Sequence, residues 1–176
     1  MIAFRHADPR YPFLWEETSQ PEARWHALGE GPVQYLCDTP DGAWAEFLRH
    51  EEIKDPEDLA TIRRALWAVE LGDEPSREPR LPAKVLTGGP ETHAACRKEA
   101  RRLWRLGATK VVAPSAALLP GAARGWRVDG GLRPGPPHDA KVVVLYGRRP
   151  DLVGWAAAME GRPGEELLPF VRHLSS

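Results

Sequence analysis

The chain has 176 residues, the length of one domain, and we predict a single domain over residues 1–176. Its 42% hydrophobic and 28% charged residues are typical of a globular protein. The 24 lysines and arginines nearly balance the 25 aspartates and glutamates, so no net charge would draw the chain directly to nucleic acid or to an anionic membrane.

Prolines followed by an acidic residue mark three predicted helix starts. Proline is favoured at the first helical position, because its missing N–H would be unpaired there, and a following carboxylate complements the helix dipole. This pattern occurs at Pro40-Asp41, Pro56-Glu57 and Pro90-Glu91. In chain order, we predict helices over 40–50, 56–64, 90–106, 151–160 and 165–174.

The predicted strands lie between these helices. Runs of β-branched and other apolar residues ended by glycine or proline predict strands over 2–5, 33–37, 66–71, 110–113 and 141–146. The stretches 73–82 and 118–140 are rich in proline and glycine and are predicted to be surface loops. Because strands and helices alternate without a regular βαβ rhythm, we predict an α+β fold of small mixed or antiparallel sheets flanked by helices.

Cysteine content and apolar runs favour a cytoplasmic protein. Cys37 and Cys96 form no C-x-x-C pair, which leaves no disulfide framework and no zinc-site spacing. The N-terminus lacks a basic region followed by an apolar stretch, so we expect no signal peptide. No run approaches the ~20 apolar residues of a membrane span.

Common nucleotide-binding and hydrolase motifs are missing from the sequence. Neither the Rossmann glycine pattern nor a P-loop occurs, and there is no H-E-x-x-H or G-x-S-x-G. Nucleotide chemistry would therefore need a different type of site.

One segment, residues 23–46, combines chemically useful side chains in a short span. Arg24 precedes a glycine turn, Tyr35 lies in a predicted strand, and Glu46 lies in a predicted helix. The core-facing stripe of that helix starts at Trp44, and at about 100° per residue Glu46 lies roughly 200° around the helix from it. Glu46 is therefore expected to face either a cleft or water.

This segment resembles the RES domain family, named for its arginine, glutamate and serine. The family pattern is an arginine followed by an aromatic residue and Asn or His, a glycine, Tyr-Leu-Ala, Ala-x-x-Glu, and later Pro-Ser after a short strand. The corresponding residues here are Arg24-Trp25-His26, Gly29, Tyr35-Leu36-Cys37, Ala43-Trp44-Ala45-Glu46 and Pro114-Ser115, with Arg5 upstream. The resemblance covers most of residues 2–116. Ala23 stands where glycine is common, Cys37 where alanine is usual, and His26 where many members have asparagine.

The resemblance implies an ADP-ribosyltransferase-like fold around an NAD cleft. It also implies that NAD is a substrate, not a prosthetic group, and that its nicotinamide–ribose bond is cleaved by water or phosphate. Some relatives look like protein mono-ADP-ribosyltransferases instead. Family members commonly act as toxins paired with a helix-turn-helix antitoxin protein.

The chemistry of that reaction suits the matched residues. Cleavage builds an oxocarbenium-like cation, which the Glu46 carboxylate would stabilise, and Ser115 would orient that carboxylate or hold the ribose. Arg24 and Arg5 would grip the two phosphates of NAD, because guanidinium groups bind phosphate in a bidentate manner. Tyr35 or Trp25 would supply an aromatic wall for the nicotinamide ring.

Other interpretations stay open at this point. Taken singly, each of these residues also fits an ordinary structural role. The chain could be a RES-fold interaction protein with an inactive cleft, or a metal-dependent hydrolase using His26, His50 and Glu46, although no third ligand is evident beside the helical pair and we predict no metal site. The helical stripe Arg97, Arg101 and Arg105 could be a solvated face or could contact a partner or phosphate. Self-assembly is also open, because four tryptophans could belong to the core or to an interface: Trp15, Trp104, Trp126 and Trp155.

Overall fold

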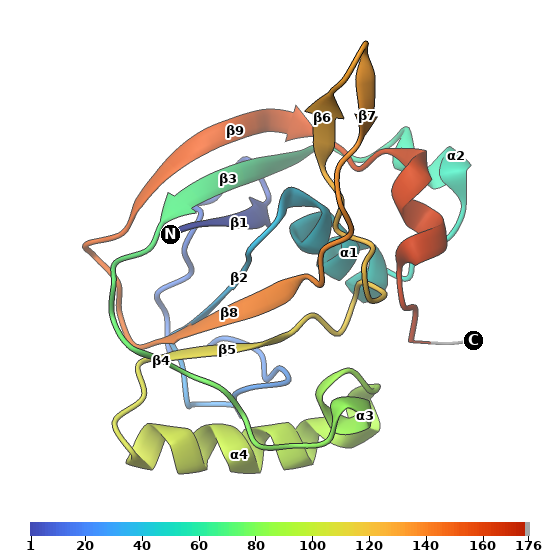
Figure 1. The fold of residues 1–176 in the computed structure, drawn as a ribbon. Helices are drawn as coiled ribbons and strands as arrows, with labels where there is room; N and C mark the ends of the chain where they lie inside the picture. Colours follow the sequence, from blue (N-terminus) through green and yellow to red (C-terminus); the bar gives the residue numbers. More distant parts are fainter. Residues whose placement is uncertain (175–176) are drawn as a thin grey trace.

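A computed structural model describes residues 1–174. Its main feature is a seven-stranded sheet with the strand order β4-β5-β8-β2-β1-β3-β9, drawn in Figure 1. All neighbouring strands are antiparallel except the β4–β5 pair, which is parallel. The strands are β1 (Ile2–Ala7), β2 (Val33–Cys37), β3 (Arg64–Glu70), β4 (Ser76–Arg77), β5 (Lys110–Pro114), β8 (Lys141–Tyr146) and β9 (Val153–Gly161).

Four α-helices and two 3-10 helices accompany the sheet in residues 1–174. They are α1 (Pro40–His50), α2 (Pro56–Leu59), α3 (Ala83–Leu86), η1 (Pro90–Thr92), α4 (His93–Arg105) and η2 (Glu165–Phe170). A separate hairpin, β6 (Trp126–Val128) with β7 (Leu132–Pro134), stands out from the body of the molecule. The predicted mixed α+β class is confirmed.

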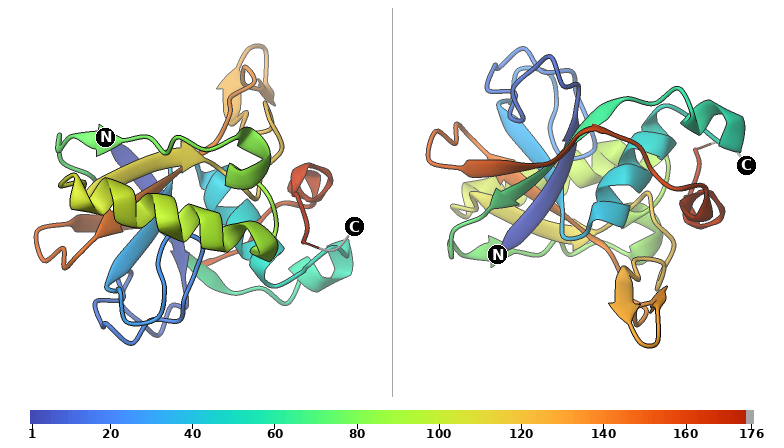
Figure 2. Two further views of the ribbon diagram at one scale, coloured as in Figure 1. Left: turned by 90° about the horizontal axis from the view of Figure 1, so that it is seen from below. Right: turned by 90° about the horizontal axis from the view of Figure 1, so that it is seen from above.

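The two long helices pack against one face of the sheet. On β2, Val33 and Tyr35 pack in the apolar cluster that includes the buried residues of α4. Cys37 lies on the same face of the strand but packs in the cluster that includes the buried residues of α1. Figure 2 shows α4 crossing that side of the sheet, with α1 at a different position along it. Leu36 faces the other way, into a third cluster with β8 residues. The two helices therefore leave room between them above β1 and β2.

Most predicted strands and the first helix have the expected bounds. The strands predicted over 33–37 and 141–146 and the helix over 40–50 agree with β2, β8 and α1. The predicted N-terminal strand continues to Ala7, and the one over 110–113 continues to Pro114. The helix predicted over 56–64 is one turn only, because β3 begins already at Arg64. The helix predicted over 90–106 begins as η1 and continues as α4.

The prediction of a helix over 151–160 is wrong. The alanine-rich stretch Ala156-Ala157-Ala158 favours a helix by propensity, but this segment is β9, which pairs antiparallel with β3. Pairing along the sheet edge overrides the weak local preference. Only the 3-10 helix η2 forms within 165–174, with Pro169 inside it. The predicted loops 73–82 and 118–140 contain β4 and the β6–β7 hairpin, and α3 was not predicted.

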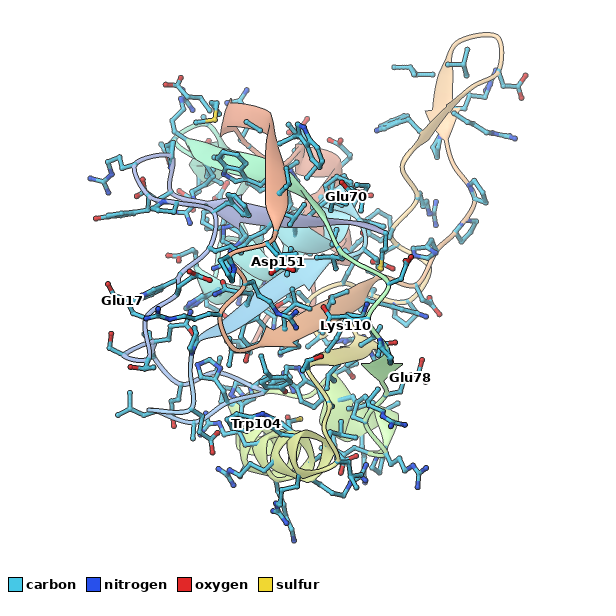
Figure 3. All side chains as sticks on the ribbon, turned by 90° about the vertical axis from the view of Figure 1, so that its left-hand side faces the viewer. Glu17, Glu70, Glu78, Trp104, Lys110 and Asp151 are labelled. Carbon is cyan, nitrogen blue, oxygen red and sulfur yellow. The ribbon has the colours of Figure 1, made fainter. Side chains whose placement is uncertain are left out.

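The four tryptophans left open by the sequence are partly exposed. Trp104, labelled in Figure 3, lies near the C-terminal end of α4 and stacks on Tyr146, with ring centroids 6.0 Å apart. Trp126 and Trp155 are 62% and 51% exposed, and Trp15 is 45% exposed. None of these side chains is part of the buried core. In residues 1–174, no helix is both long and apolar enough to cross a membrane.

Candidate functional site

A cavity of about 460 Å³ lies between α1 and the start of α4, above β1 and β2. This volume is within the range of small-molecule sites. Seven of the residues matched to the family pattern line it, and four of these are candidate site residues: Arg5, Arg24, Tyr35 and Glu46. They come from β1, the loop after it, β2 and α1, so the sheet and one helix bring them together.

Glu46 is the cavity carboxylate that the family pattern includes, and Glu22 lines the cavity as well. Its side chain lies on α1, away from the core-facing Trp44 and Leu48, and accepts a hydrogen bond from Ser115 Oγ at 3.2 Å. Burial raises the pKa of Glu46, opposed mainly by the nearby Arg49 guanidinium. Ser115 is itself buried behind Glu46, and its Oγ accepts the main-chain N–H groups of Ala117 and Leu118. Ser115 therefore has its hydroxyl proton available for the carboxylate.

Arg24 is held by the segment that leads into α4. One of its terminal nitrogens donates to Gly88 O at 2.6 Å, and the other donates to Thr92 Oγ1 at 3.0 Å and to Val85 O at 3.3 Å. These acceptors carry no formal charge, so the positive charge of the guanidinium is not neutralised by them. Arg24 thus presents a fixed cation at the cavity wall.

Arg5, on β1, is also held by an uncharged acceptor. Its guanidinium donates to Gln34 Oε1 at 2.6 Å, and Gln34 also bonds the main chain of Trp15. Burial lowers the pKa of Arg5 to about 10, which leaves it charged at neutral pH. The cavity therefore has an arginine on each side of Tyr35.

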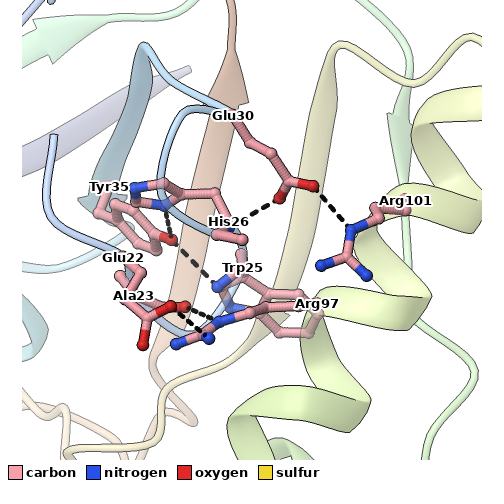
Figure 4. Close-up of polar contacts among 9 residues, drawn as sticks. Glu22, Ala23, Trp25, His26, Glu30, Tyr35, Arg97 and Arg101 are labelled. Atoms are coloured by element: carbon pink, nitrogen blue, oxygen red, sulfur yellow. Dashed lines mark hydrogen bonds and ion pairs between the residues drawn. The ribbon is translucent and has the colours of Figure 1, made fainter. Parts of the chain in front are cut away.

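Tyr35 organises the loop that carries Arg24. Its hydroxyl accepts the Trp25 N–H at 3.1 Å and lies 2.9 Å from His26 Nδ1, as Figure 4 shows. It donates to Nδ1 in the neutral tautomer that carries its proton on Nε2. Burial lowers the pKa of His26 and raises that of Tyr35, so both are neutral at physiological pH. Trp25 is 1% exposed, packs in the cluster beneath α4 and does not line the cavity. Of the two aromatic walls expected from the sequence, only Tyr35 is placed to act as one.

The arginine stripe of α4 forms hydrogen bonds to the loop that carries Arg24. Arg97 donates to Ala23 O and to Glu22, both at 2.8 Å, and Arg101 donates to Glu30 Oε1 at 2.7 Å. The other oxygen of Glu30 accepts the Ala27 N–H at 2.7 Å. Two of the three arginines in the stripe therefore hold the Arg24 loop against the helix.

Sequence reasoning missed two kinds of residue at the cavity. Arg49, three residues after Glu46, is 6% exposed and lines it. His6 and His93 also line it, and burial, followed by neighbouring arginines, lowers their pKa values to about 3 and about 4. The i, i+3 spacing of Glu46 and Arg49 places both on one face of α1 and could have identified Arg49.

The metal-site alternative receives no support from the geometry. His26, His50 and Glu46 all line the cavity. Nevertheless, within residues 1–174 no group of three or more His, Cys, Asp or Glu side chains is arranged to hold a metal ion.

We compared the chain with known proteins by sequence and by fold. No family model matches the chain. The fold is similar to that of a chain in the crystal structure of the M. tuberculosis MbcT–MbcA toxin–antitoxin complex, with a TM-score of 0.57, 15% sequence identity, and coverage of 96% of this chain and 86% of that chain. At this identity the likeness shows the fold alone.

A curated relative supplies the sequence link. Toxin Res of Pseudomonas putida (strain KT2440) is 48% identical over 60 residues, which are 34% of this chain and 39% of the relative. The resemblance to the RES domain family is thereby confirmed. Because the match spans well under half of the relative's length, the activity, substrate and partners of that protein do not transfer directly.

Proposed function

We propose that this protein cleaves the nicotinamide–ribose bond of NAD, as a glycohydrolase or phosphorolase. The observation that carries the proposal is the half-buried Glu46 carboxylate, bonded to Ser115, in a cavity whose walls carry Arg5 and Arg24. A carboxylate with arginines nearby suits a substrate that is anionic in one part and becomes cationic in another during the reaction.

The proposed reaction breaks the bond between the ribose C1′ and the nicotinamide nitrogen. The bonding electron pair leaves with the ring, which is neutral after departure, and C1′ develops oxocarbenium character that Glu46 stabilises. Water or phosphate then attacks C1′, and an attacking water gives up a proton to the Glu46 carboxylate, which returns it to solvent. Ser115 keeps the carboxylate oriented through its hydrogen bond.

The rest of the cavity would bind the substrate. Arg24 and Arg5 would hold the two phosphates, because their uncharged partners leave both cations unneutralised. Tyr35 would lie against the nicotinamide ring. NAD is then a substrate, and no prosthetic group is needed.

We further propose that the protein is the toxin of a toxin–antitoxin pair. Support comes from the name of the sequence relative, Toxin Res, and from the fold neighbour, whose structure is a toxin–antitoxin complex. The partner expected from the family resemblance is a helix-turn-helix antitoxin protein.

The decisive test is incubation of the purified protein with NAD, followed by chromatography, beside a Glu46→Gln control. We expect nicotinamide from the wild type and a loss of at least about a hundredfold in the variant, as for removal of a transition-state charge partner. The accompanying product identifies water or phosphate as the acceptor. Release only in the presence of an added protein would instead indicate a mono-ADP-ribosyltransferase. Neither release nor binding of NAD would leave an interaction protein with the RES fold.

A further inference from the structure

Arg49 connects two segments of the chain, one containing Gly88 and one that follows Ser115, the partner of Glu46. Its side chain is buried on α1, one turn after Glu46, and donates to two main-chain carbonyls that are far apart in sequence. One terminal nitrogen bonds Gly88 O at 2.7 Å, and the other bonds Ala116 O. A guanidinium can bridge two carbonyls in fixed directions, whereas a lysine ammonium offers only a point charge.

Both carbonyls are shared with a second arginine. Gly88 O also accepts Arg24, at 2.6 Å, and Ala116 O also accepts Arg172, at 3.2 Å. The result is a continuous chain of contacts from Arg24 through Arg49 to Arg172. Ala116 directly follows Ser115, so Arg49 is linked both to the proposed phosphate-binding arginine and to the residue that orients Glu46.

The charges around Glu46 come from every element packed against it. Arg49 lies on α1, Arg24 on the loop after β1, and Arg172 on the segment after η2, and Arg49 has the largest charge effect on Glu46. Cys37 on β2 faces the same carboxylate, and burial raises the pKa of its thiol, which stays neutral. Ser115 adds a neutral hydrogen bond. The cavity that Glu46 lines also carries Glu22 from the loop after β1 and four imidazoles, those of His6 on β1, His26 on the loop after it, His50 on α1 and His93 at the start of α4.

We propose that Arg49 is a positioning residue, which clamps the Gly88 and Ala116 segments together beside the helix that carries Glu46. From this fixed position its positive charge also favours the ionised form of the Glu46 carboxylate. This inference rests on the proposed NAD-cleaving function for its kinetic consequences. Its structural and ionisation consequences hold for the protein without substrate.

The first measurement is therefore made without substrate. Carboxyl-carbon NMR titration of glutamate-labelled protein, with the Glu46 signal assigned by its absence in Glu46→Gln, compares the wild type with Arg49→Met and Arg49→Lys. We expect the Glu46 midpoint to move to higher pH in Arg49→Met and to stay near the wild-type midpoint in Arg49→Lys, which retains the charge. An unchanged midpoint in a folded Arg49→Met variant would overturn the proposal.

Kinetics with NAD form the second arm. In Arg49→Met, the acidic limb of the pH profile of kcat should move to higher pH. At a pH just above the midpoint of the wild-type limb, kcat of the variant should be about tenfold or more below that of the wild type. In Arg49→Lys, KM should rise because Gly88, and with it Arg24, is no longer held, while the limb stays in place. Arg105→Met, at an exposed position on α4, is the control and should match the wild type.

The two arms separate the possible failures. A wild type that releases no nicotinamide contradicts the proposed function, and the titration then still decides the role of Arg49. If Arg49→Met does not fold, the lysine variant decides: wild-type KM in Arg49→Lys would overturn the clamp.

Discussion

The exposure and pKa of Glu46 differ from those of a glutamate on a solvated helix face. It lies on a helix whose other face packs in the core, so it could have been an ordinary solvated residue. Instead it is half-buried and lines the cavity, where partial loss of solvation raises its pKa and Arg49 and Ser115 oppose that effect. Perturbed carboxyl groups in clefts are concentrated at functional sites. From the sequence, Ser115 was expected to bond either the ribose or Glu46, and in the structure it bonds Glu46, 69 positions away.

The raised pKa predicts a pH-dependent stability difference between the wild type and Glu46→Gln. The native state holds the Glu46 proton more tightly than the unfolded chain, whose value is near 4.5. Native stability therefore decreases, relative to the variant, as the pH rises from below 4.5 through the raised pKa, and then levels off. Urea unfolding across a pH series measures this difference. A wild type that gains stability over the variant in that window would contradict it.

At the scale of elements, α4 is a support for the loop over 21–30. The sequence left its arginine stripe open between a solvated face and a partner contact. In the structure, Arg97 and Arg101 bond Glu22 and Glu30, while Thr92, just before α4, bonds Arg24. One helix thus fixes the loop from both ends. Exposed ion pairs contribute little to stability, so the main consequence is the position of the loop.

Loosening this support should weaken substrate binding more than catalysis. Arg97→Gln removes the bonds to Ala23 O and Glu22, and we expect KM for NAD to rise about tenfold, the equivalent of roughly one charge-assisted hydrogen bond. The kcat should change little, because Glu46 is untouched. Steady-state nicotinamide release measures both constants. Arg105→Gln, on the same stripe, is the control, and an equal effect there would refute a specific role for Arg97.

At the scale of the whole molecule, the sheet determines where the cavity lies. Its central strands β2 and β1 carry Tyr35 and Arg5, and β3 and β9 complete the edge beyond them. Gly154 in β9 allows Phe13 to pack close by, and Phe13 in turn lies 5.0 Å from Trp67 of β3, ring centroid to centroid. The loop between β1 and β2, which carries both Phe13 and Arg24, is thereby joined to the sheet edge.

A side chain at Gly154 should therefore destabilise the fold. A Cβ there would lie 2.9 Å from the tip of the Phe13 ring, so Gly154→Ala must displace that ring. We expect a loss of about 1–2 kcal/mol in the free energy of unfolding, in the lower part of the range for overpacking. Gly72→Ala is the matched control, because a Cβ there meets nothing within 4 Å. Equal stability of the two variants would show that the contact is unimportant.

The parts of the protein predicted correctly are those that depend on neighbouring residues in the chain. The α1 helix begins at Pro40 because Thr39 caps it by accepting the Gly42 N–H, and its apolar stripe follows helical spacing. β2 and β8 are short apolar runs ended by turn residues. The expectation that Arg24, Tyr35 and Glu46 belong to one site came from the family resemblance, and all three line the cavity.

The sequence by itself therefore determined the mixed α+β class, the bounds of α1, β2 and β8, and the segment that carries the candidate site. Only the tertiary structure decided that 153–161 is a strand, that Trp25 is buried beneath α4, that Arg97 holds a loop, and that Arg49 spans Gly88 and Ala116. Each of these depends on partners distant in the sequence: the two acceptors of Arg49 lie 39 and 67 residues away from it. Local periodicity and propensity carry no information about such partners, because they are chosen by packing across the sheet.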